Sequence, residues 1–414
     1  MPVLVTLYSI AFIKSEGNEV RTIQTTMQKL YKFQTADHII AGPNSLGDLG
    51  EQLHLVGTKI QSALIITQPP MEDLGFVDQI TNQLSAKGIK ADVNTNILPE
   101  PTVENIEEVF QSTSTENYDV LIGIGGGSVL DTTKILSVLR TNNKSVRDLL
   151  GTDLVEKPGT PTVLIPTTSG TGAEVTPNAI VTLPDEELKV GIVSKHLLPN
   201  IVILDPLLTL GLPKPITAAT GMDAFTHSLE SFISNKANLI SDMVALESIR
   251  LISSSIVEAY QDGQSVEARE KMLVGSMYGG MALTAAGTAA VHALAYPLGG
   301  KFKIPHGVVN SMLLRHVMEF NMDSITDRLY LVAEPMGIEI QGHSKEEVAQ
   351  NVVDRIVEWT NMLEIPQNLK EYGVTEEDIP ELAISASKVT RLLDNNPKDI
   401  SVEDMETIYR KLLV

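Results

Sequence analysis

The stretch that decides the fold reads DVLIGIGGGSVL and covers residues 119–130. Residues 119–124 are apolar almost throughout, which is typical of a strand buried on both faces of a parallel sheet. Three glycines follow, and residues 129–139 then predict a helix. Glycines at a strand-to-helix turn let the backbone approach a ligand closely, and the helix start offers free N–H groups and a positive dipole end to a pyrophosphate. We therefore predict a phosphate-binding turn at Gly125, Gly126, Gly127 and Ser128.

This turn meets the G-x-G-x-x-G dinucleotide fingerprint only in part, because Ser128 stands at the sixth position and no acidic residue is obvious about 20 residues further on. The alternative is a tight turn that uses glycine for steric reasons alone. We expect Asp131 to stabilise the first turn of the helix and to pair with Lys134.

Similar apolar runs lie on either side of this stretch. Residues 62–67, 162–165 and 201–204 predict further buried strands, and residues 77–87 predict a helix. The alternation of strands and helices indicates a doubly wound α/β domain. A hydroxyl-rich loop, PTTSGTG, follows the strand at 162–165 and includes Thr167, Thr168 and Thr171. Two such loops after buried strands predict a dinucleotide lying across the strand ends of the sheet.

Beyond residue 213 the pattern changes to one that is helical almost to the end. Residues 211–215 read GLPKP, which is typical punctuation between two domains. We therefore predict an α/β nucleotide-binding domain at residues 1–212, with residues 1–30 as an extension, and an all-helical metal-binding domain at residues 213–414.

The composition excludes several classes of function. The 414 residues carry a formal net charge of −21, which disfavours nucleic acid and membrane surfaces as partners. The chain has no cysteine, so any metal has to be held by nitrogen and oxygen ligands. No apolar run approaches the roughly 20 residues that span a bilayer, and the first residues do not resemble a secretory signal. We expect a cytoplasmic protein.

The helical half holds the residues that point to a metal. Asp223 and His227 are four residues apart, so a helix places both side chains on one face. His292 and His306 supply a third and a fourth candidate ligand. One carboxylate and three imidazoles suit Fe(II) or Zn(II) and do not decide between them. Each histidine alone is more often structural, so the hypothesis rests on the combination.

These motifs together resemble the iron-containing alcohol dehydrogenases. The resemblance runs from about residue 33 to the C-terminus and rests on GGGSVLDTTK (125–134), PTTSGTGAE (166–174), GMDAFTH (221–227), HALAYPLGG (292–300) and PHG (305–307). It implies an α/β dinucleotide-binding domain joined to a helical domain, with the active site between them, and a homodimer.

The resemblance also implies roles for individual residues. It gives the metal ligands as Asp223, His227, His292 and His306. It gives the cofactor contacts as Gly126, Gly127, Ser128, Thr167, Thr168, Thr176, Asn178 and Lys189, and we predict that Gln68, Gly125, Asp131 and Thr171 bind the cofactor as well. The implied reaction passes a hydride between a primary alcohol or aldehyde and NAD or NADP, with the metal polarising the substrate oxygen.

Three features depart from the family pattern. Gln68 stands where many NAD-using relatives have an aspartate at a strand end, so the sequence does not choose between NAD and NADP. Tyr296 stands where some relatives have a histidine, and its ordinary pKa of about 10 makes it a poor base near neutrality, so we expect it to shape the pocket or to hydrogen-bond the substrate. The first 30 or so residues extend beyond the usual start.

Two other functions compete with this interpretation. A metal-dependent lyase or synthase of the dehydroquinate-synthase type has the same architecture and uses the cofactor only transiently. A protein that binds nucleotide without turnover, as a sensor or scaffold, is the second alternative. The substrate itself is left open by the sequence.

Overall fold

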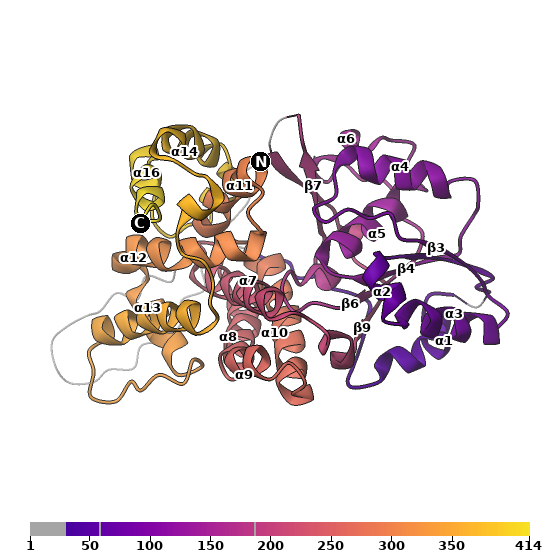
Figure 1. Ribbon diagram of the computed structural model, residues 1–414, viewed down its shortest axis with the longest axis horizontal. Coiled ribbons are helices and arrows are strands. Elements are labelled where there is room, and N and C mark those ends of the chain that lie inside the picture. The colour runs from indigo at the N-terminus through magenta and orange to yellow at the C-terminus, as the bar shows by residue number, and fades with distance from the viewer. Residues whose placement is uncertain (1–29, 58, 186–187) are drawn as a thin grey trace, which may run out of the picture. The chain divides into compact units, whose positions relative to one another are not determined.

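The computed structural model describes residues 30–57, 59–185 and 188–414. Residues 33–414 form one compact unit that carries all the elements discussed below (Figure 1). The predicted extension at residues 1–30 lies outside the described residues except for residue 30.

A six-stranded parallel sheet organises the first half of this unit. Its strand order is β1-β9-β6-β4-β2-β3, and all its pairings are parallel. The strands are β1 (His38–Ala41), β2 (Ser62–Ile66), β3 (Lys90–Asn94), β4 (Val120–Gly125), β6 (Thr162–Pro166) and β9 (Ile201–Leu204). Because all strands run in one direction, the loops after β4 and β6 emerge side by side at the same edge of the sheet. The four predicted strands are β2, β4, β6 and β9.

Helices cover both faces of the sheet, so the predicted doubly wound arrangement is confirmed. Leu64 and Ile66 of β2 pack into one apolar core with residues of α4 and α5. The alternate residues Ala63 and Ile65 pack into another core with residues of α1 and α3. Burial of successive residues on opposite faces explains the continuous apolar runs in the sequence. The helices of this half are α1 (Leu49–Gln52), α2 (Pro69–Asp73), α3 (Phe76–Ala86), α4 (Val103–Thr113), α5 (Gly127–Leu139) and α6 (Val146–Leu149).

A second, three-stranded sheet has the order β5-β8-β7 and was not expected from the sequence. It consists of β5 (Gly151–Thr152), β7 (Asn178–Leu183) and β8 (Leu188–Val193). Strands β7 and β8 form an antiparallel hairpin in which Thr182 lies opposite Lys189. The hairpin carries two of the predicted cofactor contacts, Asn178 and Lys189.

The rest of the described chain is helical, as predicted. After β9 ends at Leu204, the helices are α7 (Lys214–Ile233), α8 (Leu239–Ser253), α9 (Ile256–Gln261), α10 (Val266–Ala286), α11 (Ala290–Phe302), α12 (His306–Ala333), α13 (Lys345–Met362), α14 (Ile379–Ser387), α15 (Thr390–Leu393) and α16 (Val402–Arg410). Figure 1 shows α7–α14 and α16 beside the part of the chain that holds the six-stranded sheet. A domain boundary between residues 212 and 213 stays a prediction.

Helix α7 is the central helix of this bundle. All its residues from Thr217 to Ile233 are buried except Thr220, and its Phe225 packs edge-on against Trp359 with ring centroids 5.1 Å apart. A helix that is buried on all sides can carry polar residues only if they find partners. This requirement directs attention to Asp223, His227 and Glu230.

No single helix in the described part of the chain combines the length and apolar content needed to cross a membrane. Helices α10 and α11 would meet that test only if joined across the 107° bend between them.

Candidate active site

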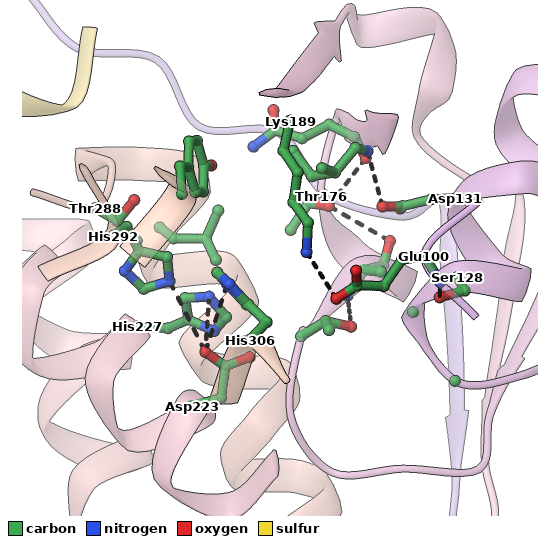
Figure 2. A pocket seen from close by; sticks show the side chains of 18 of the residues that line it. Glu100, Ser128, Asp131, Thr176, Lys189, Asp223, His227, Thr288, His292 and His306 are labelled. Atoms are coloured by element: carbon green, nitrogen blue, oxygen red, sulfur yellow. Dashed lines mark hydrogen bonds and ion pairs between the residues drawn. The ribbon is translucent and has the colours of Figure 1, made fainter. Parts of the chain in front are cut away.

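Three helices bring the four predicted metal ligands together. Asp223 and His227 lie one turn apart on α7, His292 lies in the first turn of α11, and His306 is the first residue of α12. One ligand atom from each of the four residues falls within 4.8 Å of the others. Figure 2 shows the three rings converging on the carboxylate of Asp223.

The spacing of the ligand atoms suits one metal ion. Oδ1 of Asp223 lies 3.9 Å from Nε2 of His227, 3.9 Å from Nε2 of His292 and 3.8 Å from Nε2 of His306. Two atoms that each bind one metal at about 2.1 Å are at most about 4.2 Å apart. The rings of His227 and His292 are stacked, with centroids 4.7 Å apart. The donor set therefore fits a divalent ion with nitrogen and oxygen ligands.

The protonation states also suit a metal. Burial lowers the pKa of His306 to about 3, even though Asp223 acts in the opposite direction. Burial likewise lowers the pKa of His227, again against the attraction of Asp223. For Asp223, burial acts to raise the pKa of the carboxyl, but the surrounding histidines outweigh it and hold the pKa below its ordinary value. Near neutral pH, Asp223 is thus an ionised carboxylate and His227 and His306 are neutral imidazoles, which are the forms that bind metals.

Glu230 supports this cluster and was not singled out in the sequence. Its side chain is fully buried, and its carboxylate accepts hydrogen bonds from Nδ1 of His292 at 2.5 Å and from the backbone N–H of Val291 at 2.7 Å. A proton on Nδ1 leaves the lone pair of Nε2 free to face the metal site. Glu230 follows Asp223 by seven residues and His227 by three on α7, so a polar stripe on an otherwise buried helix was the available signal.

Asn310 is a second residue that the sequence reasoning missed. Its side-chain amide nitrogen donates to Asp223 Oδ1 at 2.7 Å and lies 3.1 Å from Nε2 of both His292 and His306. Asn310 is fully buried and stands four residues after His306 on α12, which is the spacing that places both on one helix face. The amide therefore belongs to the polar lining of the cluster.

The glycine turn lies at the start of α5. Gly125 has φ +157°, and a Cβ there would meet Val129 at 2.7 Å. A Cβ on Gly127 would lie 2.7 Å from Cγ2 and 2.9 Å from Oγ1 of Thr171, in the hydroxyl-rich loop after β6. The N-cap of α5, Gly126, has no side chain to occupy the free N–H groups of the first turn. The two predicted loops therefore meet and leave backbone donors open, as a phosphate site requires.

A buried charge network ties α5 to the β7–β8 hairpin. Nζ of Lys134 contacts Oδ1 of Asp131 at 3.2 Å, as predicted, and also Thr176 Oγ1 at 3.2 Å and Asn178 O at 2.5 Å. The other carboxylate oxygen of Asp131 accepts from the backbone N–H of Ile180 at 2.9 Å. Burial lowers the pKa of the Lys134 ammonium. Asp131 and Lys134 thus place Thr176 and Asn178 beside the glycine turn.

A cavity of about 340 Å³ joins the glycine turn to the metal cluster. Most of the predicted site residues line it, namely Gly126, Gly127, Ser128, Asp131, Thr168, Thr171, Thr176, Asn178, Lys189, Asp223, His227, His292, Tyr296 and His306. Gln68, Gly125 and Thr167 are not among the lining residues. The Gln68 amide instead donates to the backbone oxygen of Ile97 at 2.9 Å.

The cavity also has lining residues that the sequence did not indicate. They include Glu100, Pro101, Ile180, Thr182, Thr220, Leu283, Thr288 and Arg391. Tyr296 lies beside the cluster, with its ring centroid 6.2 Å from that of His306. Burial raises the pKa of Tyr296, with Arg391 acting in the opposite direction, so the structure agrees that this phenol is a poor base near neutral pH.

Two family models match nearly all of this unit. The description "Iron-containing alcohol dehydrogenase" matches residues 36–206, and "Fe-containing alcohol dehydrogenase family, C-terminal" matches residues 217–413. The chain belongs to the iron-containing alcohol dehydrogenase family. This dehydrogenase is therefore an oxidoreductase of the alcohol dehydrogenase class, and no comparison favours the alternative of a dehydroquinate-synthase type of lyase.

Individual relatives agree with this placement. The dehydrogenase is 38% identical over 380 residues to long-chain-alcohol dehydrogenase 1 of Geobacillus thermodenitrificans, covering 91% of this chain and 95% of the relative. It is 34% identical over 372 residues to 1,3-propanediol dehydrogenase of Klebsiella pneumoniae, covering 89% and 95%. The crystal structure of a 1,3-propanediol oxidoreductase superposes with a TM-score of 0.89 at 33% identity, covering 93% of this chain and all of that one.

Proposed function

We propose that this dehydrogenase transfers a hydride between a primary alcohol, or its aldehyde, and NAD or NADP, and that a divalent metal takes part. The observation that supports the proposal most directly is the single cavity that joins a candidate nucleotide site to a candidate metal site. At one end lies an open helix start with a glycine turn, and at the other lie four convergent metal ligands. Family membership supports the reaction class.

The proposed metal ligands are Asp223, His227, His292 and His306. Fe(II) or Zn(II) bound there would act as a Lewis acid on the oxygen of the alcohol or aldehyde. Glu230 keeps the Nδ1 proton on His292 and so presents Nε2 to the metal, while Asn310 holds Asp223 in place. Desolvation keeps the imidazoles of His227 and His306 neutral and available as ligands.

The proposed nucleotide site lies between the two loops and the hairpin. The backbone of Gly126, Gly127 and Ser128 offers N–H donors to the pyrophosphate. Thr168, Thr171, Thr176 and Asn178 supply hydroxyl and amide groups along the cavity, and Lys189 supplies a positive charge nearer the metal cluster. Gln68, Gly125 and Thr167 do not line the cavity, so we propose that they act by supporting the loops.

The substrate is proposed to be a primary alcohol, with its chain length to be established. The two curated relatives described above are named for a long-chain alcohol and for a short diol, so a panel has to include both. Tyr296 and Arg391 stand at the wall of the cavity beside the cluster and are proposed to shape the substrate end. We also propose a homodimer located in the cytoplasm, which size-exclusion chromatography with light scattering and cell fractionation would test.

The decisive experiment strips the purified protein of metal with a chelator and restores Fe(II) or Zn(II) under anaerobic conditions. Absorbance at 340 nm then reports NADH or NADPH with ethanol, 1,3-propanediol and long-chain primary alcohols as substrates, and with aldehydes in reverse. We expect net reduced cofactor to accumulate only after one metal is restored. Binding of metal and nucleotide without net turnover of any substrate would refute the proposal and favour the lyase or a protein that binds nucleotide without turnover.

A further inference from the structure

A carboxylate that no sequence motif indicated lies inside the cavity. Glu100 follows β3 and lines the cavity together with the glycine turn and the metal ligands. Its side chain is 34% exposed, and its Oε1 lies 2.7 Å from Nζ of Lys189, whose side chain is only 7% exposed. Figure 2 shows Lys189 extending toward Glu100, with Ser128 close behind.

The backbone holds Glu100 in this position firmly. The residue stands between Pro99 and Pro101 and has φ +56°, a conformation that is uncommon for a side chain of this size. Its N–H donates to Ser128 Oγ at 3.1 Å. The next carbonyl, that of Pro101, accepts from the N–H of Thr182 at 3.0 Å. Two rigid neighbours and two hydrogen bonds therefore leave the carboxylate little freedom to move away with its backbone.

The same contacts explain why Glu100 meets Lys189. Thr182 lies opposite Lys189 in the β7–β8 hairpin, so the bond from Thr182 to Pro101 brings residue 100 alongside the lysine. From there Lys189 extends toward α11, where a Cβ on Gly299 would lie 3.4 Å from Nζ. The ion pair thus lies between the glycine turn and the metal cluster, on the path that a dinucleotide has to follow.

The pair matters because cations are scarce in the cavity. Among the described residues that line it, Lys189 and Arg391 are the basic ones other than histidine. Lys134 forms an ion pair with Asp131, is fully buried and does not line the cavity. A dinucleotide brings two phosphate charges, so a carboxylate that already neutralises Lys189 opposes its binding.

We propose that Glu100 sets the cofactor affinity of this enzyme by holding Lys189 in an ion pair that an anionic dinucleotide has to loosen. Glu100 then weakens cofactor binding and speeds cofactor release. This inference rests on the proposed nucleotide site. It concerns binding only, so it can be tested without turnover.

The test measures NADH and NADPH binding to the intact metal-loaded protein by cofactor fluorescence. Glu100→Gln removes the charge and keeps the shape, and Glu100→Asn removes the charge with a residue that tolerates positive φ. We expect both variants to lower the Kd by about threefold to tenfold and to slow cofactor dissociation in stopped-flow experiments. The difference from the wild type should shrink at high ionic strength, because salt screens the charges.

Glu104→Gln is the matched control. It removes the same charge four residues further along the chain, from an exposed pair with Arg147 at 3.3 Å, and should change the Kd by less than about twofold. Unchanged or weaker binding in both Glu100 variants, with melting temperatures near that of the wild type, would overturn the proposal. If the wild type itself binds neither nucleotide, the proposed function fails instead, and the two failures are therefore distinguishable.

Discussion

Replacing Glu230 by glutamine should weaken metal binding without removing any ligand. The carboxylate is fully buried and accepts from both the Nδ1–H of His292 and the N–H of Val291. Glutamine has the same shape but offers one acceptor oxygen and an NH2 group. One of the two buried N–H groups then faces another donor, and His292 loses the charged acceptor that keeps its proton on Nδ1.

The expected size of the effect follows from these contacts. A buried hydrogen bond to a charged group contributes about 1.5–3 kcal/mol. Loss of a group that orients a metal-bound histidine typically lowers metal affinity about tenfold to a hundredfold, which corresponds to about 1.4–2.8 kcal/mol. We therefore expect Glu230→Gln to raise the dissociation constant for Zn(II) by about one to two orders of magnitude.

Chelator competition on the metal-free protein measures this constant directly. Ser228→Ala is the control, because it deletes a fully buried hydroxyl on the same helix that bonds to Ser248 Oγ at 2.6 Å, away from the ligands. The control should lose stability but keep its affinity for the metal. Wild-type affinity in Glu230→Gln, or an equal loss in Ser228→Ala, would refute the reasoning.

Three further predictions address the fold, the nucleotide site and the metal site. Burial raises the pKa of Glu174 to about 7 from its ordinary value of 4.5, so the stability that this carboxyl group contributes is complete below pH 4.5 and is lost as the pH rises through 7. Glu174→Gln should therefore become more stable than the wild type across that window, by on the order of 3 kcal/mol at pH 8. A difference in melting temperature that does not depend on pH would contradict this. Gly127→Val should lower the affinity for the nucleotide at least about tenfold and leave metal binding intact, because a Cβ at this position would lie 2.7 Å from Thr171. Gly211→Ala is the control: a Cβ there has no other atom within 4 Å, so this variant should bind the nucleotide normally in the same fluorescence titration. His306→Ala should lose metal and activity together, as metal analysis and the 340 nm assay would report, and an active metal-free variant would exclude the ligand assignment.

The sequence predicted the parallel sheet well because its signals are local. The predicted strand at 201–204 coincides with β9, those at 62–67 and 162–165 differ from β2 and β6 by one residue at one end, and the one at 119–124 is displaced from β4 by one residue. Continuous apolar runs reveal these strands because both faces of the sheet are covered. The β7–β8 hairpin was not predicted because it is held by contacts with distant elements (α4, α5, α11 and β5), and because β8 carries the charged Lys189.

The residues that support the site, Glu230 and Glu100, could not be predicted from the sequence for a different reason. Glu230 and His292 are 62 residues apart, and Glu100 and Lys189 are 89 apart. Each pair exists only because two distant elements pack together, and a residue pattern along the chain does not report such packing. The clustering of Asp223, His227, His292 and His306 could be predicted because one aspartate and three histidines fall together in motifs of a single family, although each histidine alone is more often structural.

The charges around the metal cluster form a consistent whole once the supporting residues are included. Asp223 and Glu230 place two buried carboxylates on α7, one at the centre of the cluster and one behind His292. Desolvation keeps His227 and His306 uncharged, and His306 lies at the N-terminal end of α12, where the helix dipole further disfavours a proton. The two negative charges of Asp223 and Glu230 would match one divalent cation, whereas burial of two carboxylates without a positive charge nearby is costly. The sequence indicated one of these charges, and the structure adds the second, Glu230, which would help to balance a divalent cation bound by the cluster.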